Sequence, residues 1–586
     1  MSSYAATSPD VVRSLIRQKA FPLSSTSGSC SGYIQANVTI MPSKYSDDFE
    51  AYCRLNSGPL SFLHRSKFGA VDAGYLSRDT NIKTDMVSMN RYEYGVLTGT
   101  LDNLSDQDLT QFDTFYLGCS YSFEEALQKA GVPVRNIDEG AKNISMYVTN
   151  QPCSPVGPFK GKLVVTMRPV SAENLEKAVN VTAAIPEGHG APVHIGNPEH
   201  LGIKSLQEPD FGDAVCLKPG DIPVFWPCGV TCTETIKLTK EIPLVYTHTH
   251  GLMFLADVKV TVYPTPPIKV KLVDAQHQIY SLLSEETEKQ IMAIEKLILA
   301  DPEIREIKSF LNREDFLRSC LALSHAKKVL FTTGFSCPYN ENDGLAGFIS
   351  LALVLLELGK EVTILVDEPL KLLLKQAFEK LPDIPNPSNL RVLGQKDVSK
   401  ELIAEVNALL ACGNMATDVN GNYYALEPNS LSKNNHLHPI ENIIQSSNNL
   451  SQKFAIEGSQ ARVEKVQANI QEYTSFGTLF SNSISTDLLV AAGVSNWGGL
   501  GLAFGLHELY KDKIHQRYLK RGCGESKVSK LSTLPSLESE RRILEVVEDL
   551  GMADGICKEP MHVDGMKFEN QHQKLILDLK KIAASQ

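Results

Sequence analysis

The stretch that decides the fold of the N-terminal half runs from residue 163 to residue 215. It contains LVVTMRP (Leu163–Pro169), GHGAPVHIGNPEHLGI (Gly188–Ile203) and PDFGDAV (Pro209–Val215). The apolar run at its start predicts a buried strand that ends at Pro169. We expect Arg168, at this strand end, to face a cleft, because burial of an unpaired guanidinium is very costly.

The loop after this strand is rich in Gly and Pro and carries His189, His194 and His200. Arg, His and Asp side chains thus occur close together, and these types bind a carboxylate and move a proton. We predict Arg168 as the carboxylate clamp, His194 as the general acid or base, and Asp213 as the group that orients His194 or accepts an ammonium. The alternatives are a structural ion pair, a histidine bonded to backbone and a turn residue.

Further candidates lie on either side of this stretch. Arg135 is a second carboxylate clamp or a structural ion pair, and Tyr147 and Asn150 bind substrate or pack at a strand end. Cys119 lies in a strand-to-helix turn, where a helix N-terminus can bind an anion or lower the pKa of a thiol. It is therefore either a substrate-binding or acyl-thioester residue or an inert buried thiol.

Composition narrows the class of protein. The chain has 586 residues, which predicts two to four domains, and a net charge of −11 without a long basic run, which argues against nucleic acid and anionic membranes as partners. Its longest apolar stretch, 348–358, is too short to span a bilayer. The twelve cysteines form no CxxC pair, which indicates reduced thiols and no structural zinc site.

The N-terminal half reads as short strands that end in Gly- or Pro-containing turns, so we expect one sheet whose turns line a cleft. Residues 1–31 are predicted to be disordered or a targeting segment, because Arg13 and Arg17 lie in a Ser- and Ala-rich sequence. A helix is expected at 45–56 and another at 123–129, with Ser122 and Glu125 as a capping box. His248 and His250 are expected in a turn, with a metal pair as the alternative.

A proline-rich break begins at residue 263, and we place a linker at 263–277 between domains at 32–262 and 278–586. Helices are expected at 285–300, 313–325 and 537–550. The segment 327–368 predicts a strand, a helix capped by Asp343 and a parallel strand, without a GxGxxG or P-loop motif. Asn496 to Gly499 form a ligand-binding turn or a close helix contact. The fold class is therefore α/β, with an N-terminal mixed domain followed by a parallel-sheet domain.

Eight segments carry a family resemblance, in order and with family-like spacing. They are GYIQANVTIMP, GCSYSFEEAL, VPVRNIDEG, MYVTNQPC, VVTMRP, GAPVHIGNPEHLGI, PDFGDAV and PVFWPCGVT. The chain resembles the D-glutamate cyclase family, and its second half resembles the C-terminal domain of the animal mitochondrial members. The resemblance implies a hydro-lyase of D-amino acid metabolism that converts D-glutamate to 5-oxo-D-proline and water. It implies the mitochondrial matrix, with the cytoplasm as the alternative.

The implied reaction has no redox or phosphoryl step, so no cofactor or metal is expected. Two alternatives remain: a metal-dependent amidase-like hydrolase that uses His189, His194, His248 and His250, and a non-catalytic protein that binds an acidic metabolite. The chain departs from the family in the region 451–467, which lacks a Gly-rich loop, at 410–413, and at Leu252, where bacterial members carry a histidine. The partner is a small molecule, and a homo-oligomer is left open.

Overall fold

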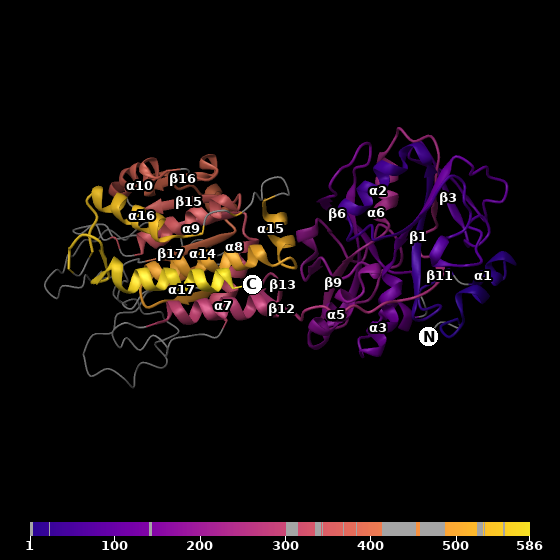
Figure 1. Cartoon of the computed structure of the whole chain (residues 1–586), viewed down its shortest axis with the longest axis horizontal. Helices are drawn as coiled ribbons and strands as arrows, with labels where there is room; N and C mark the ends of the chain where they lie inside the picture. The colour runs from indigo at the N-terminus through magenta and orange to yellow at the C-terminus, as the bar shows by residue number, and fades with distance from the viewer. Residues whose placement is uncertain are drawn as a thin grey trace. The chain divides into compact units, whose positions relative to one another are not determined.

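The computed structural model contains two compact units, residues Met1–Val270 and Lys271–Gln586 (Figure 1). It describes residues 4–585 apart from 23, 140–142, 301–313, 334–341, 343, 367, 383, 413–452, 458–486, 524–530, 532–533 and 555–556. The first unit combines antiparallel sheets with short helices, and the second contains a parallel sheet. The predicted α/β class is confirmed.

The larger sheet of the first unit is antiparallel and has the order β2-β5-β1-β10-β3-β4, with β11 also paired to β1. Strand β1 is buried along almost its whole length, and the sheet forms around it. The strands are β1 (Tyr33–Pro42), β2 (Phe62–Ser66), β3 (Met89–Glu93), β4 (Val96–Leu101), β5 (Phe112–Gly118), β10 (Val245–His248) and β11 (Phe254–Lys259).

The smaller sheet of the first unit has the order β6-β7-β9-β8 and is also antiparallel. Its strands are β6 (Met146–Pro152), β7 (Lys162–Ser171), β8 (His194–Ile195) and β9 (Asp221–Pro227). The predicted strand end at Pro169 is wrong, because β7 continues to Ser171 and Pro169 pairs with Pro223. A proline fits there since pairing of β7 with β6 stops at Thr166, so no ladder bond is lost on that side.

The helices of the first unit are α1 (Pro9–Arg17), α2 (Ser46–Leu55), α3 (Glu124–Lys129), α4 (Arg135–Asp138), α5 (Leu175–Ala183) and α6 (Thr231–Leu238). The helix expected at 45–56 is confirmed as α2. The predicted capping box is wrong: Ser122 lies in the 3-10 turn η3 (Ser120–Phe123), and its hydroxyl accepts a hydrogen bond from the Gln35 amide. The Glu125 carboxylate instead pairs with Lys129.

Residues 4–31 are folded where they are described, since they form α1 and a buried turn. The disordered alternative for 1–31 therefore does not fit this segment. The predicted linker at 263–277 contains the whole of strand β12 (Ile268–Asp274), which pairs with β13 (Ile279–Ser284).

The second unit has a parallel sheet of order β16-β15-β14-β17-β18-β19. The chain starts in the middle of this sheet, builds outward on one side and returns to build the other, as in doubly wound folds. Its strands are β14 (Lys328–Thr333), β15 (Glu361–Val366), β16 (Leu390–Gly394), β17 (Ala408–Cys412), β18 (Lys453–Glu457) and β19 (Leu488–Ala491); a separate hairpin pairs β20 (His562–Val563) with β21 (Met566–Lys567).

The predicted strand–helix–strand unit is confirmed, since β14 and β15 are parallel and α9 lies between them in the sequence. The helices of this unit are α7 (Glu285–Ile298), α8 (Asp315–His325), α9 (Leu345–Glu357), α10 (Glu368–Lys380), α11 (Lys400–Glu405), α14 (Ser495–Lys511), α15 (Gln516–Cys523), α16 (Leu537–Asp549) and α17 (Gln573–Ala584). The predicted cap Asp343, the loop 334–341 and most of 451–467 lie outside the described residues.

Residues 496–499, predicted as a ligand turn or a helix contact, lie in the first turn of α14. The Asn496 side chain accepts a hydrogen bond from the Gly347 amide of α9, and a Cβ on Gly347 or Gly499 would overlap the other helix. The structure thus matches the close-contact alternative. Within the described residues, no helix is both long and apolar enough to cross a bilayer.

Candidate active site

Arg168 and His194, predicted to act together, lie on opposite faces of the smaller sheet. Arg168 is directly opposite Val224 of β9, whereas His194 is opposite Phe225. Successive residues of a strand point to opposite faces, and paired residues share a face. The two side chains therefore cannot meet in one site unless the sheet is rebuilt.

Arg168 is buried in an ion pair. Its Nη2 donates to Glu124 Oε1 at 2.9 Å and to the Ser120 hydroxyl at 3.2 Å, and both charged side chains are at most 3% exposed. The guanidinium lies over the rings of Phe123 and Trp226. Its Nε atom is buried and has no hydrogen-bond partner. The cleft-facing strand end is therefore wrong, but one donor of the guanidinium remains available to a ligand.

His194 packs on the other face, near the rings of Phe225 and His200. Its Nε2 is 2.7 Å from the carbonyl oxygen of Asn197, which is the backbone-bonded alternative. Tyr147 shares that face and donates from its hydroxyl to the carbonyl of Leu206 at 2.7 Å. Both side chains are buried in contacts that complete the local fold.

The remaining predicted polar residues are dispersed. Arg135 pairs with Asp221 at 3.0 Å, and Asp221 is three residues from Val224 along β9, roughly 10 Å by strand rise. Asn150 is exposed and contacts the neighbouring Gln151. Asp213 is exposed, and its carboxylate accepts from the amide of Asn143 at 3.0 Å. None of these contacts brings Asp213 to His194.

Cys119 is buried between the two sheets, beside Cys228 and Tyr121. Burial raises the pKa of the Cys119 thiol well above its ordinary value and that of Cys228 to about 12. Of the alternatives for Cys119, the structure therefore fits the inert buried thiol, because loss of solvation outweighs the backbone amides at the start of η3. Both residues are neutral thiols near neutral pH.

His248 and His250 were expected in a turn. His248 is the last residue of β10, and His250 lies in the turn that follows. His248 is buried, with Nδ1 3.2 Å from the amide nitrogen of Val38, and His250 packs on the ring of Phe211. The Nε2 atoms of both imidazoles are buried and have no hydrogen-bond partner. Buried polar atoms are seldom left unsatisfied, so each of these nitrogens, like Arg168 Nε, is a candidate for contact with a polar ligand.

We call this set the buried polar cluster, and it comprises Cys119, Tyr121, Glu124, Arg168, Cys228, His248 and His250. Strands β5, β9 and β10 all end at it. Asn37 of β1 connects their ends, since its amide donates to the Gly118 carbonyl at 2.6 Å and its side chain fills the space where Gly229 lacks a Cβ. Glycine is required at position 229 for this close approach of Asn37, whereas a Cβ on Gly118 would meet the Glu187 carbonyl.

A second connection passes through Asn143. The Tyr121 hydroxyl donates to Asn143 Oδ1 at 2.9 Å, and Asn143 Nδ2 donates to the His250 carbonyl at 3.3 Å. Asp213, which accepts from the Asn143 amide, therefore supports this connection from outside. Sequence reasoning missed Tyr121, Asn143 and Glu124, although Tyr121 and Glu124 lie in the quoted segment GCSYSFEEAL.

Apart from the Arg168–Glu124 ion pair, the titratable side chains of the cluster are uncharged near neutral pH. Burial lowers the pKa of His248 to about 3 and that of His250 to about 4, and a second histidine or Lys237 adds to each effect. Both imidazoles are therefore neutral at physiological pH, next to one fixed ion pair. A bound carboxylate would favour their protonated forms and raise these pKa values.

The metal-hydrolase alternative required His189, His194, His248 and His250 at one ion. The structure separates them, because His189 Nδ1 is 3.0 Å from the Gly58 carbonyl and His194 lies on the far face of the smaller sheet. In the described parts of the chain, no three His, Cys, Asp or Glu side chains gather closely enough to hold a metal ion.

Known proteins match both halves of the chain. A family model described as D-glutamate cyclase matches residues 114–257, and one described as D-glutamate cyclase-like, C-terminal, matches residues 294–580. The human protein named "D-glutamate cyclase, mitochondrial" is 30% identical over 99% of this chain and 98% of its own length. A "Putative hydro-lyase" of Staphylococcus haemolyticus is 42% identical over 44% of this chain and 97% of its own.

Proposed function

Because the chain belongs to the D-glutamate cyclase family, we propose that it cyclises D-glutamate to 5-oxo-D-proline with loss of water. The observation that carries this function is the full-length relationship to the human enzyme, which covers both units. The protein is accordingly a carbon–oxygen lyase. Its substrate is a small molecule, and we place the chemistry at the buried polar cluster of the first unit.

The reaction sets clear demands on a site. The α-amine attacks the γ-carboxyl carbon, a C–N bond forms, and a C–O bond breaks. Two protons leave the ammonium, and the departing oxygen takes up both. The oxygen therefore leaves as one water molecule, and atoms and charge balance. The amine and carboxyl are tethered in one molecule, so proximity is favourable. The site must mask a carboxylate and relay protons.

The cluster offers groups for each demand. Arg168 presents its free Nε to a substrate carboxylate, and the guanidinium supplies the positive charge that makes the carboxyl a better electrophile. His248 and His250 have ring centroids 6.3 Å apart and an unpartnered nitrogen each, so each ring can accept one of the two protons that leave the ammonium and then return it to the departing oxygen. The substrate carboxylates raise the basicity of both rings.

The predicted roles of His194, Tyr147 and Asn150 are not retained in this proposal, because their contacts lie away from the cluster. Asp213 is retained as the residue that accepts a hydrogen bond from the Asn143 amide, and Cys119 is retained as a buried residue that lines the site. The human relative is named as mitochondrial, and we assign this protein to mitochondria, with the matrix as the compartment.

The proposed function is tested with the purified full-length protein, D-glutamate and mass spectrometry of 5-oxoproline, with L-glutamate as the matched comparison. We expect formation of 5-oxoproline from D-glutamate, with a much lower rate from L-glutamate. The proposal fails if a folded sample, checked by circular dichroism, forms no 5-oxoproline from D-glutamate above the uncatalysed background.

A further inference from the structure

The segment before β1 is built into the first unit instead of trailing from it. Ser25, Thr26 and Ser27 are at most 1% exposed, which is unusual for polar residues in a turn. They follow helix α1, which sequence composition associates with disorder or targeting. The contacts of this segment lead from the outer edge of the sheet to the buried polar cluster.

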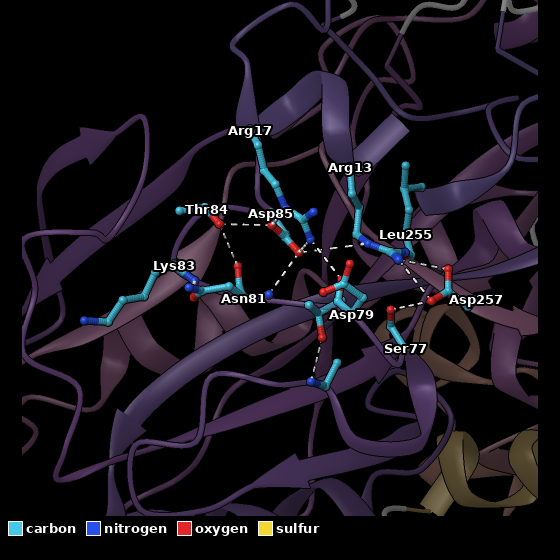
Figure 2. A network of polar contacts seen from close by, with 12 residues as sticks. Arg13, Arg17, Ser77, Asp79, Asn81, Lys83, Thr84, Asp85, Leu255 and Asp257 are labelled. Carbon is cyan, nitrogen blue, oxygen red and sulfur yellow. Dashed lines mark hydrogen bonds and ion pairs between the residues drawn. The ribbon is translucent and has the colours of Figure 1, made fainter. Parts of the chain in front are cut away.

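Two arginines fix α1 on the first unit, and their contacts form the network in Figure 2. Arg13 Nη1 donates to the Leu255 carbonyl at 2.6 Å, and its Nη2 donates to both oxygens of Asp257 at 2.9 and 3.0 Å. Arg17 makes a two-pronged contact with Asp85 at 2.7 and 2.8 Å. Such paired contacts define orientation as well as distance, so the position of the following turn is also fixed.

The turn after α1 lies on the loop that carries His250. The amide of Thr26 donates to the Gly251 carbonyl at 2.8 Å, and the Thr26 hydroxyl accepts from the Met253 amide at 3.1 Å. Gln35 of β1 donates from Nε2 to the Thr26 carbonyl at 3.0 Å. The N-terminal segment and the His250 loop are thereby held in one arrangement.

Ser27 acts directly on the charged pair of the cluster. Its hydroxyl donates to Glu124 Oε2 at 2.7 Å and accepts from Asn136 Nδ2 at 3.0 Å, and the Gly28 amide lies 3.3 Å from the same carboxylate oxygen. The other oxygen of Glu124 accepts from Arg168 Nη2. Ser27 therefore prevents Glu124 from turning both oxygens toward the guanidinium, and Arg168 Nε stays unpartnered.

We propose that Ser27 is a positioning residue, which keeps Glu124 bound to Arg168 Nη2 through one oxygen, so that Nε, the neighbouring donor on the same edge, can bind a substrate carboxylate. This inference rests on the proposed function, since the carboxylate is that of D-glutamate. It also means that α1 and the turn through Ser27 belong to the working enzyme. A targeting signal that included them would have to be retained after import.

The first test compares Ser27→Ala with Ser29→Ala, a nearby serine that is similarly buried and whose carbonyl accepts from Gln35. In Ser27→Ala, Glu124 can swing onto Arg168 Nε and compete with substrate. We expect KM for D-glutamate to rise about tenfold, equivalent to about 1.4 kcal/mol, with a much smaller change in kcat and no change in KM for Ser29→Ala. An unchanged KM in folded Ser27→Ala overturns the inference.

A rise in KM without a matching fall in kcat separates positioning from a structural role, because a partly unfolded sample lowers apparent kcat and leaves KM unchanged. Asn136→Ala serves as a second variant, since it removes the amide that orients the Ser27 hydroxyl. We expect KM to rise in the same direction. If Ser27→Ala does not fold, the KM of Asn136→Ala decides the matter.

Two further readouts do not depend on turnover, so they test the hold of Ser27 on Glu124 and the retention of the N-terminal segment separately from the proposed function. Hydrogen exchange across residues 118–129 is expected to be faster in Ser27→Ala than in Ser29→Ala, and equal rates contradict the role of Ser27. Mass spectrometry of the enzyme isolated from mitochondria is expected to find an N-terminus at or before Ser8. An N-terminus beyond Ser31 contradicts retention of the segment.

Discussion

Replacement of Glu124 by Gln tests whether the buried pair with Arg168 holds the first unit together. The change removes one charge, keeps the shape and leaves the guanidinium buried without a counter-ion. Loss of one partner of a buried pair costs about 3–5 kcal/mol, and we expect the lower end because the amide oxygen still accepts a hydrogen bond. The matched control is Glu125→Gln, whose pair with Lys129 is 30% and 72% exposed and contributes about 0.3–0.5 kcal/mol.

The assay is urea unfolding followed by tryptophan fluorescence, because the ring of Trp226 lies 5.8 Å from the Arg168 guanidinium. With a slope of about 3 kcal/mol per molar urea, a loss of about 3 kcal/mol lowers the midpoint by about 1 M. The control is expected to shift the midpoint by less than about 0.2 M. Equal midpoints for Glu124→Gln and Glu125→Gln would refute the reasoning.

Three further outcomes follow from the same cluster. The folded-state pKa of His248 is about 3, which is below its unfolded value. The free energy of unfolding is therefore expected to fall as pH drops below about 6.5, by about 2 kcal/mol at pH 5 for this residue. Urea midpoints measured at pH 7 and pH 5 are then expected to differ less in His248→Gln than in the wild type. Peptide mapping after brief treatment with a thiol reagent at pH 7.5 should find Cys216, which is exposed, labelled before Cys119, and early labelling of Cys119 would mean that its thiol is activated. Gly118→Ala should destabilise the first unit by about 1–3 kcal/mol or more, because its Cβ would overlap the Glu187 carbonyl, whereas Gly99→Ala, with open space around it, should leave the thermal midpoint nearly unchanged.

The second unit was the more predictable part of the fold. Apolar runs in 327–366 and the glycine after the intervening helix indicate strand, helix and strand directly, and the structure has them as β14, α9 and β15. Local patterns are sufficient there because consecutive elements of a parallel sheet are also neighbours in space. The end of β7 was not predictable in this way, since Ser171 is kept in the strand by pairing with the distant Asp221.

The candidate site depended on information that local sequence does not carry. Arg168 was recognised, but its partner Glu124 could not be told apart from Glu125, because only packing decides which of two adjacent carboxylates is buried. His194 was chosen for its loop, although the register of β8 directs it away from Arg168. His248 was discounted because a histidine in a turn is usually solvated, and here β1 covers it.

The central claim is that D-glutamate is cyclised at the buried polar cluster and not at the predicted loop histidine. The most direct measurement compares kcat for D-glutamate in the wild type, His248→Gln, His250→Gln and the control His194→Gln. Loss of a group that transfers a proton lowers the rate about 10²–10⁴-fold, so we expect this loss in either cluster variant and a kcat within about threefold of wild type in the control. A large loss in His194→Gln, with His248→Gln and His250→Gln near wild type, would contradict the account.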